Sequence, residues 1–230
     1  DYFDICFTAN WTTNYTQFAG RGAFLDITEL LPQYAPETWE FIPEELWTAA
    51  SIDGSIYGVP SYKEMGWQSG FFVNSDMAEE YGIDLSTVKT LEDYTEVLKT
   101  VKEKSTAAGE SVIGVSGMSF NLTTPYESLT GTPTLPGASP VSAYGNFAGE
   151  AEVFNQYASQ DYMDYCSLVR DWYNNGYLSA DPVNYDSDTA NRDNDFANGK
   201  LFSYVISYAP GAAEAEEAKT GHGVTLVPLM

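Results

Sequence analysis

Four short segments of the sequence place aromatic side chains beside polar ones, and each segment follows a predicted strand or hairpin. Open α/β sheets bind ligands at the ends of their strands. A sugar ring stacks its C–H face on an aromatic ring, and its hydroxyls form hydrogen bonds with amides and carboxylates. The mixture therefore suits a neutral carbohydrate, although any one of these rings taken singly is more often a half-buried loop residue. The candidate ligand-binding residues are Asn10, Trp11, Lys63, Glu64, Trp67, Gln68, Asn121, Tyr126, Ser207 and Tyr208.

We expect nine of these residues to divide into two roles. The rings that would stack on sugar are those of Trp11, Trp67, Tyr126 and Tyr208. The side chains that would bind hydroxyls are Asn10, Glu64, Gln68 and Asn121, with Lys63 as a further donor.

A metal site is not indicated by the sequence. The acidic residues after Asp181 invite comparison with a calcium loop, which needs glycine at position 6 and glutamate at position 12. Counting from Asp186, those positions hold Asn191 and Ala197, so we interpret the segment as a solvated loop that caps a helix. A single histidine, His222, without a CxxC or HExxH motif leaves no strong transition-metal site, and we expect no cofactor.

Catalysis is the alternative function. A glycosidase needs a pair of carboxylates, but with 33 acidic residues some pair will always lie at a suitable distance. A Ser-His-Asp triad would have to use His222, and no GxSxG motif accompanies it. We therefore predict binding without catalysis and keep a carbohydrate-active enzyme as the runner-up. A third possibility is a surface module that binds a peptide, although few cations lie near these segments to hold a peptide carboxylate.

Composition narrows the class of protein. The chain has 230 residues, 33 acidic and 10 basic, for a formal net charge of -23. Nucleic acid and anionic lipid should repel such a polyanion. A hydrophobic content of 43% argues against disorder, and no apolar run approaches the length of a membrane span. We expect both Cys6 and Cys166 to be buried small hydrophobic residues, with one long-range disulfide as the alternative.

The elements that must position these residues alternate between strands and helices. This alternation predicts an α/β fold with largely parallel sheets. Helical spacing of Trp39, Ile42 and Trp47 indicates two short helices within 36–50, split at Pro43. Strands are predicted at 2–8, 70–73, 112–115, 201–206 and 224–227, a hairpin at 52–60, and a long loop at 130–145. Further helices are predicted at 26–31 (closed by Pro32), from Asn74 or Ser75 to Gly82, and at 90–104, 162–177, 189–198 and 209–219.

Six segments in the same order carry a resemblance to bacterial extracellular solute-binding proteins of the maltose-binding-protein-like family. The most specific is Asp53-Gly-Ser-Ile-Tyr-Gly-Val-Pro60, followed by Glu64 and a strand that ends in Asn74-Ser-Asp76. The others are Asp4–Trp11, Gly22–Leu31, Phe120–Tyr126, Phe196–Lys200 and Gly223–Leu229. Lipid-anchored, oligosaccharide-binding relatives from Gram-positive bacteria look closer overall.

The resemblance implies a periplasmic-binding-protein type II-like fold, with two lobes and a hinge, that closes on sugar and delivers it to the permease subunits of an ABC importer. The protein would be extracellular or periplasmic, held at the membrane only by a lipid anchor outside this sequence. Family ligand contacts correspond to Trp11, Glu64 and Tyr126, with an aromatic near Tyr208; Trp11 replaces an acidic residue of the family. The resemblance also leads us to expect that both ends of the family's chain are missing here and that the first lobe is incomplete. We expect lobe 1 to comprise 1–113 and 222–230, and lobe 2 to comprise 114–221.

Overall fold

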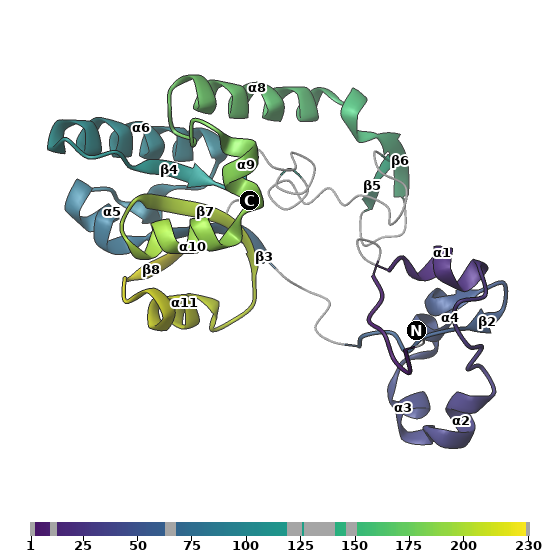
Figure 1. Cartoon of the computed structure of the whole chain (residues 1–230). Helices are drawn as coiled ribbons and strands as arrows, with labels where there is room; N and C mark the ends of the chain where they lie inside the picture. The colour runs from purple at the N-terminus through teal and green to yellow at the C-terminus, as the bar shows by residue number, and fades with distance from the viewer. Residues whose placement is uncertain are drawn as a thin grey trace. The chain divides into compact units, whose positions relative to one another are not determined.

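A computed structural model describes residues 3–9, 13–62, 68–118, 126, 141–145 and 151–228. The chain divides into two compact units, residues 1–65 and 66–230 (Figure 1). We call them unit 1 and unit 2 and consider each separately.

Unit 1 contains four short helices and one hairpin. The helices are α1 (Tyr15–Gly20), α2 (Leu30–Tyr34), α3 (Pro36–Phe41) and α4 (Glu44–Ala50), and the hairpin joins β1 (Ser51–Ile52) to β2 (Ser55–Ile56). The predicted split at Pro43 and the predicted hairpin are both confirmed.

The turn residues Asp53 and Gly54 both have positive φ, as a two-residue hairpin requires. The prediction that Pro32 closes a helix at 26–31 is wrong. It lies in the first turn of α2, where its missing N–H has no helical partner to lose. A small core of Leu31, Ile42, Trp47 and Ile56 holds the unit together.

The segment 3–9 forms no helix and belongs to none of the sheets of the described residues. Phe3 is 84% exposed, Ile5 92% and Phe7 66%. The prediction of a buried strand here is therefore wrong for this structure. Cys6 lies on the same segment and is exposed, Cys166 is partly buried, and both thiols are free, so the prediction that both are buried is wrong as well.

Unit 2 is built on a four-stranded sheet in the order β4-β7-β3-β8. Its strands are β3 (Gln68–Asn74), β4 (Ile113–Ser116), β7 (Leu201–Tyr208) and β8 (Val224–Pro228). β4 runs parallel to β7, whereas β3 runs antiparallel to both β7 and β8. The sheet is mixed, not largely parallel as predicted, because β3 enters between two strands that run in the opposite direction.

Helices cover both faces of this sheet (Figure 1). On one face, α5 (Ser75–Tyr81), α6 (Leu91–Ala108) and α8 (Gln160–Asn174) form the main core, in which Phe71 stacks on Tyr94 at 3.9 Å between ring centroids. On the other face, α10 (Thr189–Ala197) and α11 (Ala212–Thr220) pack around Phe72 and Tyr204. The predicted α/β layering is confirmed.

Side-chain caps begin two of the predicted helices. The Asn74 side chain accepts a hydrogen bond from the Met77 amide at 3.0 Å and begins α5. Thr90 and Asp93 form a reciprocal capping box at the start of α6.

Elements that were not predicted are α1, the 3₁₀ turns η1 (Leu85–Thr87) and η2 (Gln156–Ala158), and α9 (Pro182–Ser187). The antiparallel pair β5 (Val141–Gly145) and β6 (Ala151–Asn155) was also missed, and β5 falls inside the predicted 130–145 loop.

The division of the chain differs from the expected lobes. We expected a boundary near residue 114, with 222–230 in the first lobe. In the structure β4 and β8 belong to the same sheet, because β3 pairs with both β7 and β8 and β7 pairs with β4. None of the described helices is long and apolar enough to cross a membrane.

Candidate functional site

The sheet of unit 2 brings several predicted binding segments to one of its ends. The strands β4, β7 and β8 all finish at this end, and the antiparallel strand β3 begins there. Gln68 therefore lies opposite Tyr208, and Gly70 opposite Pro228. We call this the C-terminal end of the sheet.

Three of the ten predicted residues have backbones at this end: Gln68, Ser207 and Tyr208. Gln68 pairs with Tyr208, and Ser69 pairs with Ser207 on the neighbouring strand. Six others lie outside the described residues: three precede β3, one follows β4, and two follow the segment 3–9. These are Lys63, Glu64, Trp67, Asn121, Asn10 and Trp11.

Tyr208 is half-buried on the sheet face that α10 and α11 cover. Its ring centroid lies 6.2 Å from that of Phe72. Burial raises the pKa of the Tyr208 phenol, so the hydroxyl is neutral at physiological pH. A neutral phenol both donates and accepts hydrogen bonds, as recognition of a sugar hydroxyl requires.

Tyr126 lies in the core, contrary to the ligand-stacking role that we predicted. Only 1% of its surface is exposed. Its ring packs edge-on against Tyr162 at 5.2 Å and against Tyr165 at 5.6 Å. These neighbours cover the ring, and they belong to the core on the opposite sheet face from Tyr208. In this structure Tyr126 is therefore a packing residue.

Asp186 fixes the turn that follows β4. Its Oδ1 accepts hydrogen bonds from the Ser116 hydroxyl at 2.8 Å and from the Gly117 amide at 2.9 Å. Gly117 has a φ of +86°, so the chain turns sharply directly after the strand. Asp186 thus fixes the backbone at Gly117, directly after β4. Sequence reasoning missed this role, because the partners are about 70 residues apart and no local pattern links them.

The other aspartates of the acidic segment also have partners within the chain. Asp188 accepts bonds from the amides of Ala190 and Asn191, which confirms that it caps a helix. Asp195 accepts a bond from the Tyr185 hydroxyl at 2.9 Å. Among the described residues, no group of three histidine, cysteine or carboxylate side chains has a geometry that could hold a metal ion.

Asp193 belongs to a charged network on the α10 and α11 side. Its Oδ1 lies 2.7 Å from a guanidinium nitrogen of Arg192, and its Oδ2 lies 2.7 Å from the Nζ of Lys219. Burial opposes ionisation of this carboxyl, but hydrogen bonds from Lys219 and Arg192 outweigh it and lower the pKa of Asp193. The Arg192 guanidinium also sits over the Tyr204 ring at 4.6 Å. This network joins two helices and the sheet, and we assign it to stability.

Comparison with known proteins identifies relatives of the chain. A carbohydrate ABC transporter substrate-binding protein of Streptococcus pneumoniae serotype 4 (strain ATCC BAA-334 / TIGR4) is 25% identical over 188 residues, which are 80% of this chain and 35% of the relative. A solved N-glycan transport solute binding protein (NgtS) of S. pneumoniae, in complex with Man5GlcNAc, matches with a TM-score of 0.68 and 21% identity over 95% of this chain. The S. pneumoniae ABC-transporter substrate binding protein FusA, in complex with kestose, matches with a TM-score of 0.66 and 18% identity over 93% of this chain.

These likenesses confirm the predicted type II α/β fold. The chain spans 45% of NgtS and 44% of FusA, so it is less than half as long as those proteins. The family of bacterial extracellular solute-binding proteins matches residues 3–229, nearly the whole sequence. The chain belongs to this family of bacterial extracellular solute-binding proteins.

Proposed function

We propose that the full-length protein binds a neutral oligosaccharide outside the cell and delivers it to an ABC importer. The observation that carries the proposal is the convergence at the C-terminal end of the sheet. There Gln68 lies opposite Tyr208 although the two are 140 residues apart in sequence, so polar and aromatic residues from separate segments meet at one place.

The ligand should be uncharged. The chain carries a net charge of -23, which repels anions, and the aromatic-polar segments suit the C–H faces and hydroxyls of a sugar. The relatives support the choice of an oligosaccharide, since the solved ones include complexes with Man5GlcNAc and kestose.

The contacts would come from segments on several strands. The stacking rings are Trp11, Trp67 and Tyr208, and the groups that bind hydroxyls are Asn10, Lys63, Glu64, Gln68, Asn121 and Ser207. Tyr126 contributes to the core of unit 2, and Asp186 holds the end of β4.

Binding would act through closure of two lobes around the sugar, because a ligand that contacts both lobes binds the closed state better and shifts the population toward it. No catalytic step is involved. One carboxylate among the described residues at this end, that of Asp186, accepts hydrogen bonds from the protein's own Ser116 and Gly117, which is a positioning role. Transfer to the permease would follow from the closed state, with a lipid anchor outside these residues keeping the protein at the cell surface.

Thermal-shift measurements of the full-length protein with a panel of sugars would test this function. A ligand present at 100 times its dissociation constant adds about 2.7 kcal/mol to the stability of the folded state, enough for a clear rise in melting temperature. The double variant Glu64→Ala with Trp67→Ala should weaken binding of the best oligosaccharide at least tenfold in calorimetry. Glu103→Ala with Tyr173→Ala, which removes the same kinds of side chain from α6 and α8, is the matched control.

Two results would contradict the proposal. Unchanged affinity in the double variant of Glu64 and Trp67 would show that those residues do not bind the sugar. Release of shorter sugars from the oligosaccharides that bind would show a glycosidase instead.

A further inference from the structure

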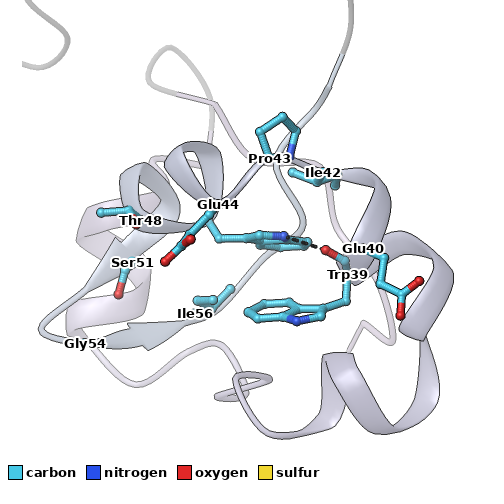
Figure 2. Close-up of a pocket in the computed structure, with 10 residues that line it drawn as sticks. Trp39, Glu40, Ile42, Pro43, Glu44, Thr48, Ser51, Gly54 and Ile56 are labelled. Carbon is cyan, nitrogen blue, oxygen red and sulfur yellow. Dashed lines mark hydrogen bonds between the residues drawn. The ribbon is translucent and has the colours of Figure 1, made fainter.

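Unit 1 contains a pocket of about 480 Å³ that the proposed sugar site does not use. It lies between α3, α4 and the β1–β2 hairpin (Figure 2). Its volume falls within the range of small-molecule sites, about 300–1,000 Å³.

Two stacked indoles form the aromatic part of this pocket. The ring centroids of Trp39 and Trp47 are 4.9 Å apart with an interplanar angle of 28°. The Trp47 indole N–H donates to the Trp39 carbonyl at 3.2 Å, which fixes the Trp47 ring relative to α3. Trp47 is 4% exposed, whereas Trp39 is half-buried, so Trp39 offers the ring surface that a ligand can reach.

The polar groups around the indoles are mostly hydrogen-bond acceptors. Figure 2 shows the Glu44 carboxylate on the same side of the stacked rings as Thr48 and Ser51, and Glu40 on the other side. Carboxylates only accept, and hydroxyls both donate and accept. The Trp47 indole N–H is already used within the protein, which leaves the Trp39 indole N–H and the hydroxyls as the side-chain donors of the lining. The pocket therefore matches a ligand that is rich in donors.

The charge of the pocket lining also favours a ligand that is rich in hydrogen-bond donors. The residues that line the pocket include two carboxylates and no basic side chain. In residues 3–9 and 13–62 as a whole, Arg21 is the one basic side chain against eight acidic ones. An anionic ligand would be repelled, and a neutral sugar would find few donors to meet its oxygen atoms.

We propose that this pocket binds a small organic cation, an ammonium or guanidinium group on an apolar body. The cation would lie over the Trp39 indole and donate hydrogen bonds to the Glu44 carboxylate and the Ser51 hydroxyl, with the apolar body against Ile56. Because Glu44 is exposed and water screens its charge, we expect weak binding, in the millimolar range.

The experiment uses the full-length protein and two probes of the same shape. Butylguanidinium chloride carries the charge, butylurea is its neutral counterpart, and potassium chloride keeps the ionic strength constant. Saturation-transfer NMR titrations should show saturable binding of butylguanidinium and at least tenfold weaker binding of butylurea.

Neighbouring glutamates of α4 supply a matched pair of variants. Glu44→Gln should weaken butylguanidinium binding at least fivefold, whereas Glu45→Gln, one residue along and outside the pocket lining, should leave it unchanged within twofold. Trp39→Phe should also weaken binding, because a phenyl ring attracts cations less than an indole. The proposal is overturned by no saturable binding, by equal binding of the two probes, or by equal effects of the two glutamate variants.

Discussion

Removal of the Asp186 carboxylate should destabilise unit 2 and weaken sugar binding together. Asp186→Ala deletes the acceptor of two hydrogen bonds, from the Ser116 hydroxyl at 2.8 Å and the Gly117 amide at 2.9 Å. Ser116 is 1% exposed, so water cannot replace the lost partner without a local opening. Leaving buried donors unsatisfied costs about 1–3 kcal/mol, and hydrogen bonds to charged groups lie at the upper part of that range. We therefore expect a loss of about 2–3 kcal/mol in the free energy of unfolding.

Two further variants test whether the loss of stability comes from these two hydrogen bonds or from removing any carboxylate. Asp186→Asn keeps an oxygen acceptor and should recover roughly half of the lost stability. Asp171→Ala removes an exposed carboxylate from α8 and should change stability by less than about 0.5 kcal/mol.

Urea unfolding of the full-length protein, followed by far-ultraviolet circular dichroism, measures stability, and calorimetry measures sugar affinity. Because Asp186 orients the segment after β4, its alanine variant should lose affinity at a temperature where it remains folded. If Asp186→Ala matches Asp171→Ala in both measurements, the turn does not depend on this carboxylate and the assignment of Asp186 as a positioning residue fails.

Three further predictions address the sheet, the acid stability and the extended segment of unit 1. A methyl group at Gly70 would collide with the Val227 carbonyl of the adjacent strand, so Gly70→Ala should destabilise by about 2 kcal/mol or more in urea unfolding, and a smaller effect would mean that β3 and β8 can separate freely. Hydrogen bonds from amides at the start of α6 lower the pKa of Asp93 below 3.8, so its contribution to stability is full above that pH and is lost as the pH falls below it. Asp93→Asn should therefore lose less melting temperature between pH 5 and pH 3 than the parent protein, and equal losses would contradict this. The exposed apolar side chains of 3–9 alternate as in a strand, so we expect this segment to pair with another strand in the full-length protein. Cys6 should then react slowly with a thiol reagent until urea is added. Rapid reaction in the native protein would contradict this expectation.

Features set by a few neighbouring residues could be predicted from the sequence. The capping box of Thr90 and Asp93 is completed within four residues, and the Asp53–Gly54 turn needs only the backbone freedom of two. The split between α3 and α4 follows in the same way from Pro43. Such signals do not depend on the rest of the chain, so they hold wherever the element finally packs.

Aromatic residues show the limit of this reasoning. Spacing alone predicted that Trp39 and Trp47 share a helical region, but it could not show that one indole would be buried and the other left open to a pocket. Tyr126 likewise follows a strand and carries the right ring for a sugar. Its burial depends on Tyr162 and Tyr165 of α8, which pack against it from another part of the chain.

The sequence by itself determined the class of the protein. Its alternating elements and its family segments pointed to an α/β solute-binding fold, which the structure and the family match bear out. The tertiary structure alone decided the direction of β3, the pairing of Gln68 with Tyr208 and the hold of Asp186 on the end of β4. The physical reason is that composition and turn chemistry are local properties, whereas strand direction and side-chain partners are set by packing between residues that are 70 to 140 positions apart.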